Sequence, residues 1–142
     1  MPAHWLVKTE PSTYAFEDLV RDRRTTWDGV ANALALIHLR AMAKGDLVLV
    51  YHSGAQKAVV GLARVAAGPR PDPKADDPRL VVVDLEPVAA AKTPLPLAAV
   101  KAEPACRDLG LVRQSRLSVM PVADAAWAFL VAGAGLAPAA PR

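Results

Sequence analysis

One short stretch of the chain, residues 25–32, gathers residue types that could hold a flat, polar ligand. An aromatic ring at Trp27 stands beside a carboxylate at Asp28, and an amide follows at Asn32. An aromatic ring offers a stacking surface, while a carboxylate or an amide can hydrogen-bond the edge of a ligand. Two interpretations of Trp27 stay open: a wall of a pocket, or an ordinary core tryptophan, because aromatic residues are most often buried.

Catalytic chemistry has weaker support. The histidines His4, His38 and His52 have no cysteine, histidine or carboxylate at metal-ligand spacing. The chain also lacks a phosphate-binding glycine loop and a Gly-x-Ser-x-Gly turn, which argues against a nucleoside triphosphatase and a serine hydrolase. Cys106 lies in no catalytic motif. We therefore expect a binding protein that is not an enzyme and uses no metal and no cofactor.

The composition predicts one globular domain. The chain has 142 residues, of which 53% are hydrophobic, so it can bury a core of its own. A net charge of +3 permits a polyanionic partner but predicts few phosphate contacts. No apolar run approaches the roughly 18 residues of a membrane span, so no membrane association is expected. The single cysteine and the lack of a visible export signal predict a cytoplasmic location.

The elements that must position these residues are short, because 13 prolines interrupt the chain. We expect strands at residues 4–9, 47–51, 59–66 and 80–88, and helices at residues 16–20, 31–43, 95–101 and 124–131. Pro87 should close its strand, residues 68–78 should form an exposed loop, and Arg116 and Ser118 should share one face of an extended segment. Gly61 could mark a bulge. About five strands without a βαβ rhythm predict a small bent sheet or partly open barrel of the α+β class.

Three motifs resemble, in order and spacing, those of the EVE domain family of thymocyte nuclear protein 1-like proteins. They are Trp5-Leu6-Val7-Lys8-Thr9-Glu10-Pro11-Ser12, then Thr26-Trp27-Asp28-Gly29-Val30-Ala31-Asn32 followed by Lys44-Gly45-Asp46 through Tyr51-His52-Ser53, and finally residues 111–122 with Arg113-Gln114-Ser115-Arg116-Leu117-Ser118. The resemblance implies a PUA-like fold: a bent β-barrel of about five to six strands with flanking short helices. It also implies an EVE (PUA-like) domain over residues 1–132 and a flexible C-terminal tail over residues 133–142.

The resemblance further implies a function and a site. Related domains hold a modified base outside its strand, so the expected partner is a modified cytosine in DNA or a modified RNA base, single-stranded or flipped out. The protein itself is expected to be a monomer or a weak homodimer. The implied ligand-binding residues are Lys8, Glu10, Ser12, Trp27, Asp28, Gly29, Val30, Asn32, Tyr51, His52, Ser115, Arg116, Leu117 and Ser118.

Simpler roles remain open for several of these residues. Lys8 and Glu10 can pair with each other at a strand end, and Tyr51 can be a core residue with a satisfied hydroxyl group. His52 can be a turn residue, and the serines of the last motif can form local hydrogen bonds.

The second motif also departs from the family pattern. The family commonly reads Trp-Asp-Gly-Val-Arg-Asn-Tyr-Gln-Ala-Arg-Asn, whereas this chain has Ala31, Ala33, Leu34, Leu36 and Ile37 at the Arg, Tyr, Gln, Arg and Asn positions. Losing two positive charges weakens attraction to phosphate. The alternative function is a small-molecule or protein-interaction module on the same fold, with Leu34, Leu36 and Ile37 as a partner or dimer surface.

Overall fold

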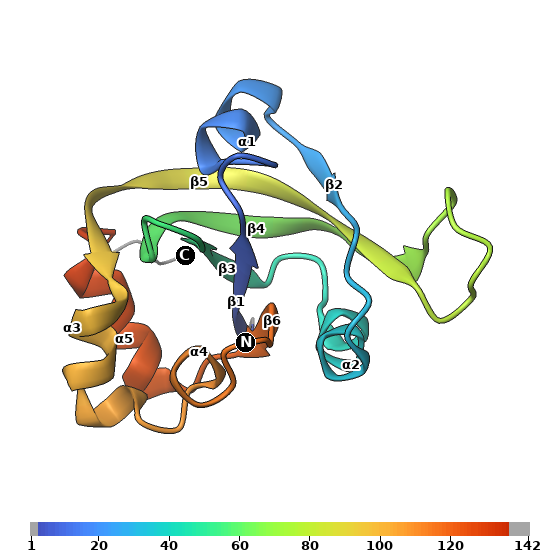
Figure 1. Ribbon diagram of the computed structural model, residues 1–142. Coiled ribbons are helices and arrows are strands. Elements are labelled where there is room, and N and C mark those ends of the chain that lie inside the picture. Colours follow the sequence, from blue (N-terminus) through green and yellow to red (C-terminus); the bar gives the residue numbers. More distant parts are fainter. Residues whose placement is uncertain (1–2, 137–142) are drawn as a thin grey trace.

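The computed structural model describes residues 3–136, which form a six-stranded mixed sheet with short helices around it (Figure 1). The order across the sheet is β2 (Thr25–Trp27), β5 (Val81–Pro96), β4 (Ala58–Pro71), β3 (Leu47–His52), β1 (His4–Thr9) and β6 (Val119–Pro121). β1 runs parallel to β3, and the other neighbouring pairs are antiparallel. The helices are α1 (Phe16–Asp22), α2 (Ala33–Ala41), α3 (Leu97–Ala102), the 3-10 turn η1 (Pro104–Cys106), α4 (Gly110–Arg113) and α5 (Asp124–Gly133).

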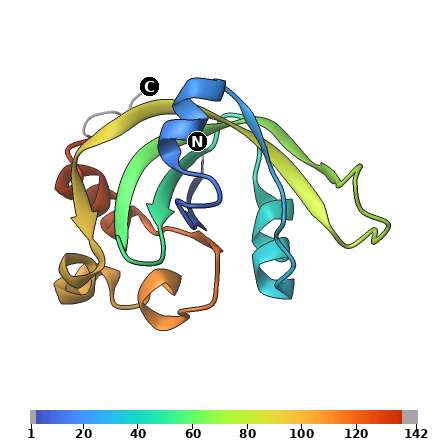
Figure 2. The same cartoon turned by 45° about the horizontal axis from the view of Figure 1, so that its top comes forward.

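The α+β class and the number of strands are confirmed, but the predicted barrel is not closed. The short strands β2 and β6 form the two edges of the sheet in the described residues. The sheet is nevertheless strongly curved, because the long strands β4 and β5 arch over the molecule (Figure 2). α2 lies near the β4–β5 loop, whereas α3 and α5 lie at the opposite end of the sheet (Figure 1).

The β4–β5 hairpin corrects two expectations. Strand β4 continues to Pro71, into the predicted loop, and β5 continues past Pro87 as far as Pro96. Pro87 is tolerated because the register between the strands shifts next to it, where Pro87 pairs with Ala63. The bulge that Gly61 was expected to mark lies beside it: the register shifts against both β3 and β5 between Val59 and Gly61, so Val60 is the unpaired residue. The absence of a side chain at Gly61 lets the ring of Phe16 from α1 lie against the strand.

Two segments around the predicted site differ from expectation. Helix α2 begins at Ala33 and not at residue 31, because the Asn32 side chain caps it by accepting a hydrogen bond from the Ala35 amide at 3.0 Å. Residues 110–113 form α4 and β6 begins only at Val119, so the extended face expected for Arg116 and Ser118 is wrong. In the C-terminal tail, Ala134 and Leu136 are buried, and residues 137–142 lie outside the described residues.

The buried carboxylate of Asp46 ties the start of the chain to the sheet. It accepts hydrogen bonds from the Trp5 indole at 2.9 Å, from the Ala43 amide at 2.9 Å and from the Ala3 amide at 3.0 Å. These donors satisfy a carboxylate that is only 5% exposed. Asp46 therefore holds the N-terminus of β1, the strand between β3 and β6, beside the end of α2.

Candidate functional site

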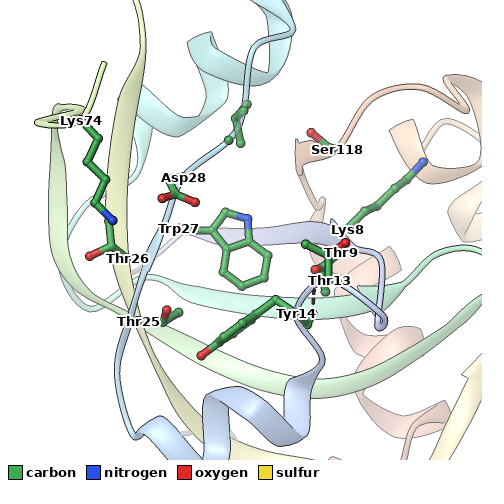
Figure 3. Close-up of a pocket in the computed structure, with 12 residues that line it drawn as sticks. Lys8, Thr9, Thr13, Tyr14, Thr25, Thr26, Trp27, Asp28, Lys74 and Ser118 are labelled. Atoms are coloured by element: carbon green, nitrogen blue, oxygen red, sulfur yellow. Dashed lines mark hydrogen bonds between the residues drawn. The ribbon is translucent and has the colours of Figure 1, made fainter. Parts of the chain in front are cut away.

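A cavity of about 520 Å³ opens beside the edge strand β2 and extends to the strand β1 (Figure 3). Four separate parts of the chain form its wall: the end of β1 with the turn that follows, β2 with the turn that follows, the β4–β5 loop, and the residue before β6. The lining residues are Lys8, Thr9, Thr13, Tyr14, Thr25, Thr26, Trp27, Asp28, Gly29, Val30, Lys74 and Ser118.

Trp27 is both a packed residue and a wall of this cavity. Its side chain lies at the centre of the site, and the residue as a whole is 8% exposed (Figure 3). The ring of Tyr14 meets it edge-on, with ring centroids 6.2 Å apart and an interplanar angle of 86°. Such a contact between aromatic rings is favourable and fixes the orientation of both. The two interpretations left open by the sequence are therefore compatible with each other.

The carboxylate of Asp84 on β5 anchors the strand that carries Trp27. It accepts hydrogen bonds from Thr26 at 3.0 Å and from Arg24 at 2.9 Å, and Arg70 on β4 donates a third at 2.8 Å. Desolvation of Asp84 raises its pKa, but the hydrogen bonds from Arg70, Arg24 and Thr26 outweigh this effect and hold the pKa below the ordinary value. β2 has only three residues, so this anchor supplements a very short ladder of backbone hydrogen bonds.

The rim of the cavity combines charged and hydroxyl groups. The Lys8 amine donates to the Ser115 carbonyl at 2.9 Å, and its partial burial lowers the pKa of this amine. The exposed carboxylate of Asp28 has no hydrogen-bond partner among the described residues, and Figure 3 shows it close to the Trp27 ring. Gly29 has φ +76°, a value that glycine adopts without strain, and it turns the chain so that Val30 is buried.

A second, more open cavity of about 380 Å³ adjoins the first. It is lined by Asn32, Leu34, Arg113, Gln114, Ser115, Arg116 and Leu117. The two cavities are neighbours because Leu117 lines one and Ser118 the other, and because Lys8 of the first cavity hydrogen-bonds Ser115 of the second. The last sequence motif therefore does meet the Trp27 stretch, although it forms a helix and a turn instead of an extended face.

The structure divides the predicted site residues into three groups. The first cavity brings together Lys8, Trp27, Asp28, Gly29, Val30 and Ser118, and the second brings together Asn32, Ser115, Arg116 and Leu117. The remaining residues, Glu10, Ser12, Tyr51 and His52, lie outside both cavities.

These four residues lie in a turn or in the buried part of β3. Glu10 and Ser12 are exposed in the turn before α1, where the Glu10 carbonyl accepts from the backbone amide of Tyr14. Tyr51 is 3% exposed within β3, and its burial raises the pKa of the phenol. His52 is also 3% exposed and accepts from the Phe16 amide through Nε2 at 3.0 Å. Its Nδ1 atom must then carry the proton and donate to the Gln56 side chain at 2.7 Å.

The sequence reasoning missed Tyr14, Lys74 and the threonines of the first cavity. Tyr14 lies two residues after the first motif, so a search of its flanking residues could have found it. Lys74 belongs to a proline-rich loop and carries no sequence signal, because only the path of the β4–β5 hairpin brings it to β2.

Within residues 3–136, no three histidine, cysteine or carboxylate side chains come together in a way that could hold a metal ion. In the same part of the chain, no helix has both the length and the apolar character needed to cross a membrane.

Comparison with known proteins identifies the family. A model of the EVE domain matches residues 3–132. Human thymocyte nuclear protein 1 is 28% identical over 165 aligned residues, which cover 92% of this chain and 73% of that protein. The match to the EVE model, over residues 3–132, covers most of the chain.

Solved structures agree with this match. A protein from Agrobacterium tumefaciens has a TM-score of 0.91 at 34% identity and covers 99% of each chain. Human thymocyte nuclear protein 1, crystallised in complex with 5-methylcytosine-containing DNA, has a TM-score of 0.83 at 27% identity and covers 98% of this chain and 99% of that chain. An ASCH protein from Zymomonas mobilis, at 11% identity and a TM-score of 0.63 over 92% of this chain and 94% of that chain, shares the fold alone. The chain belongs to the EVE domain family.

Proposed function

We propose that this protein reads a modified base, without acting as an enzyme, by holding the base in the cavity beside Trp27. The observation that carries this proposal is the cavity itself, which joins an aromatic wall to a rim of hydroxyl groups, an amine and an unpaired carboxylate. Its volume of about 520 Å³ lies within the range of about 300–1,000 Å³ that is common for small-ligand pockets. A flat base needs one stacking surface and a few polar contacts at its edge, and this cavity offers both.

The human relative supports a modified cytosine as the first ligand to test. That protein was crystallised with DNA that contains 5-methylcytosine. In the present chain Asp28 can accept a hydrogen bond from the exocyclic amine of cytosine, which is the contact that carboxylates commonly make with this base. Thymine and uracil lack this amine, so Asp28 would favour a modified cytosine over either of them. A modified base in RNA would use the same stacking and edge contacts.

The ligand should be a base that is already unstacked or weakly paired. Removing a base from a duplex costs a few kcal/mol, whereas stacking on an aromatic ring returns only about 1–3 kcal/mol. We therefore expect single-stranded oligonucleotides or mismatched sites to bind more tightly than perfect duplexes. This order of affinity distinguishes a base pocket from a surface that binds nucleic acid through its phosphates alone.

The test is a titration against single- and double-stranded oligonucleotides, each with one modification, beside unmodified strands of the same sequence. We expect a preference for 5-methylcytosine over cytosine in single-stranded DNA. The Asp28→Asn variant should bind both of these strands more weakly, because Asp28 accepts from the amine that both bases carry. Asp124→Asn is the matched control, because Asp124 is fully exposed on α5, away from the cavity. Equal binding of all modified and unmodified strands would refute the proposed function.

A second candidate function, a dimer-forming interaction module, has one observation in its favour. Leu34 and Ile37 of α2 are 36% and 56% exposed, next to a groove of about 520 Å³ between α2 and the β4–β5 loop. Leu36 also lines this groove, although it is only 4% exposed and packs in the core. A monomeric mass in solution at high protein concentration would exclude this candidate, while a dimer abolished by Ile37→Glu would support it.

A further inference from the structure

We propose that the base recognised in the Trp27 cavity remains part of a strand, and that this strand crosses the cavity with one phosphodiester at Lys74 and the other at Arg116. This inference rests on the proposed function and adds the path of the nucleic acid to it. It follows from the three cations at the two adjoining cavities and from their lack of carboxylate partners.

Most arginines of the described residues are already engaged by carboxylates. Arg24 and Arg70 bind Asp84, and the other ion pairs of this kind are Arg21 with Asp18 and Asp22, Arg64 with Glu86, Arg79 with Asp77, and Arg113 with Asp108. Lys8, Lys74 and Arg116 form no ion pair within the part of the chain that the structure describes. Seven other cations of the described residues likewise form no ion pair, namely Arg23, Arg40, Lys44, Lys57, Lys92, Lys101 and Arg107. Lys8, Lys74 and Arg116 differ from these because they line the two cavities, where a ligand strand would meet them.

The position of these cations defines two sides of the base pocket. Lys74 comes from the β4–β5 loop and lies on one side of Trp27, while Lys8 lies on the other (Figure 3). The Lys8 amine is held by the Ser115 carbonyl, so the cation that reaches further out on this side is Arg116, which is exposed in the adjoining cavity. A strand whose central base enters the pocket would place its flanking phosphates on these two sides.

The adjoining cavity also has the groups that a phosphodiester needs. Arg116 presents a planar fork of donors, and the side chains of Asn32 and Gln114 line the same cavity. The Asn32 side-chain oxygen is occupied by the Ala35 amide, which leaves its amide nitrogen as a donor. Asp28 is four residues before Asn32, but its carboxylate lies in the first cavity. There it would meet the edge of a base and not a phosphate.

The charge balance favours a strand over a free base. Lys8, Lys74 and Arg116 oppose the single carboxylate of Asp28 in the two cavities, once the Arg113–Asp108 pair is set aside as neutral. A neutral nucleoside gains nothing from this excess positive charge, whereas each phosphate of a strand releases counterions when it binds. Contacts at exposed cations are individually weak, so they should appear mainly as a dependence of affinity on salt.

The experiment compares a 5-methylcytosine nucleoside with DNA and RNA trinucleotides that carry 5-methylcytosine, or cytosine, at the centre. Fluorescence anisotropy measures labelled trinucleotides at several salt concentrations, and the nucleoside is used as a competitor. We expect the modified trinucleotide to bind at least tenfold more tightly than the nucleoside. The plot of log affinity against log salt should have a slope of about −1.4, which is the value for two phosphates of a single strand.

Two variants assign the two phosphates. Lys74→Ala and Arg116→Gln should each reduce the magnitude of the slope by about 0.7. Lys101→Ala and Arg107→Gln are the matched controls, because both residues are exposed near α3, at the opposite end of the sheet, and should not alter the slope.

The outcomes separate this inference from the proposed function. A modified trinucleotide that binds no better than the nucleoside, or slopes that stay unchanged in Lys74→Ala and Arg116→Gln, would overturn the strand path while base reading stands. Equal affinity for methylated and unmethylated trinucleotides would instead refute base reading in the Trp27 cavity, and the strand path with it. Any difference between the DNA and RNA trinucleotides identifies which strand fits the path.

Discussion

Replacing Trp27 by alanine removes the stacking wall of the cavity and should abolish most of the affinity for a modified base. Stacking of a base on an aromatic ring is worth about 1–3 kcal/mol, so the affinity for a 5-methylcytosine strand should fall by about 5- to 150-fold. Trp27→Phe keeps an aromatic ring at the same position and should retain most of that affinity. Both variants keep the backbone of β2, so the difference between their affinities measures the contribution of the aromatic ring.

The same substitution has a cost in stability that the structure allows us to anticipate. Trp27 is only 8% exposed and packs against Tyr14, so truncation to alanine should lower the free energy of unfolding by about 3–5 kcal/mol. A domain of this size has roughly 5–15 kcal/mol in total, so this loss is a large share of the stability and the folded fraction of the variant has to be known. Circular dichroism and a urea titration establish the folded fraction before binding is measured.

Trp127→Ala provides a control with equal burial. Trp127 is also 8% exposed, but it stacks on His4 from α5 with ring centroids 4.1 Å apart and does not line the cavity. Its removal should cost similar stability and leave the affinity of the folded protein for the modified strand unchanged. If folded Trp27→Ala binds this strand within twofold of the unmodified protein, or if Trp127→Ala loses as much affinity, the stacking argument is refuted.

Two further substitutions test the supports of the site. Asp84→Asn should destabilise the protein at pH 7 by about 1–3 kcal/mol, because it weakens the anchor of β2 to Arg24 and Arg70. The pKa of Asp84 is lowered in the folded state. In urea titrations the difference in free energy of unfolding between the protein and Asp84→Asn should therefore be complete above the unfolded carboxyl pKa of about 3.9, and it should disappear as the pH falls through the lower native pKa. A constant difference down to about pH 2 would contradict the role of the charged Asp84 carboxylate as the anchor of β2. His52→Leu leaves the buried Phe16 amide without its acceptor and should cost about 1–3 kcal/mol by the same measurement. Loss of modified-base affinity in folded His52→Leu, with stability unchanged, would mean that His52 is a ligand residue.

Local patterns in the sequence were sufficient for the elements with strong periodicity or clear ends. The predicted strand at residues 4–9 coincides with β1, and the apolar run that predicted a buried strand forms β3. β2 was not predicted, because three residues carry too little pattern and its pairing partner, Val83 to Leu85, lies far along the chain. The length of β5 was underestimated for a related reason: register shifts in the pairing with β4, which no local pattern reveals, accommodate Pro87.

The candidate site was predictable to the extent that its residues lie within continuous motifs. Trp27 and its neighbours form one wall, and Ser118 of the last motif reaches the same cavity. His52 belongs to the second motif and stays a prediction as a ligand residue, since its ring accepts from the Phe16 amide and lines neither cavity. Lys74 could not be predicted, since a loop residue reaches the cavity only through the geometry of a long hairpin.

The pairing of β1 with β6 has a consequence for how this protein folds. The Lys8 amide donates to the Ser118 carbonyl at 2.9 Å, so the wall of the cavity joins the first strand of the chain to the last. Contacts between such distant parts of a chain slow folding, because a long loop must close before they form. The cavity therefore exists only after the last strand has been added, and a ligand there stabilises the finished fold alone. At a ligand concentration of 100 times Kd this stabilisation is about 2.7 kcal/mol, so occupied molecules should resist proteolysis through global unfolding for much longer than empty ones.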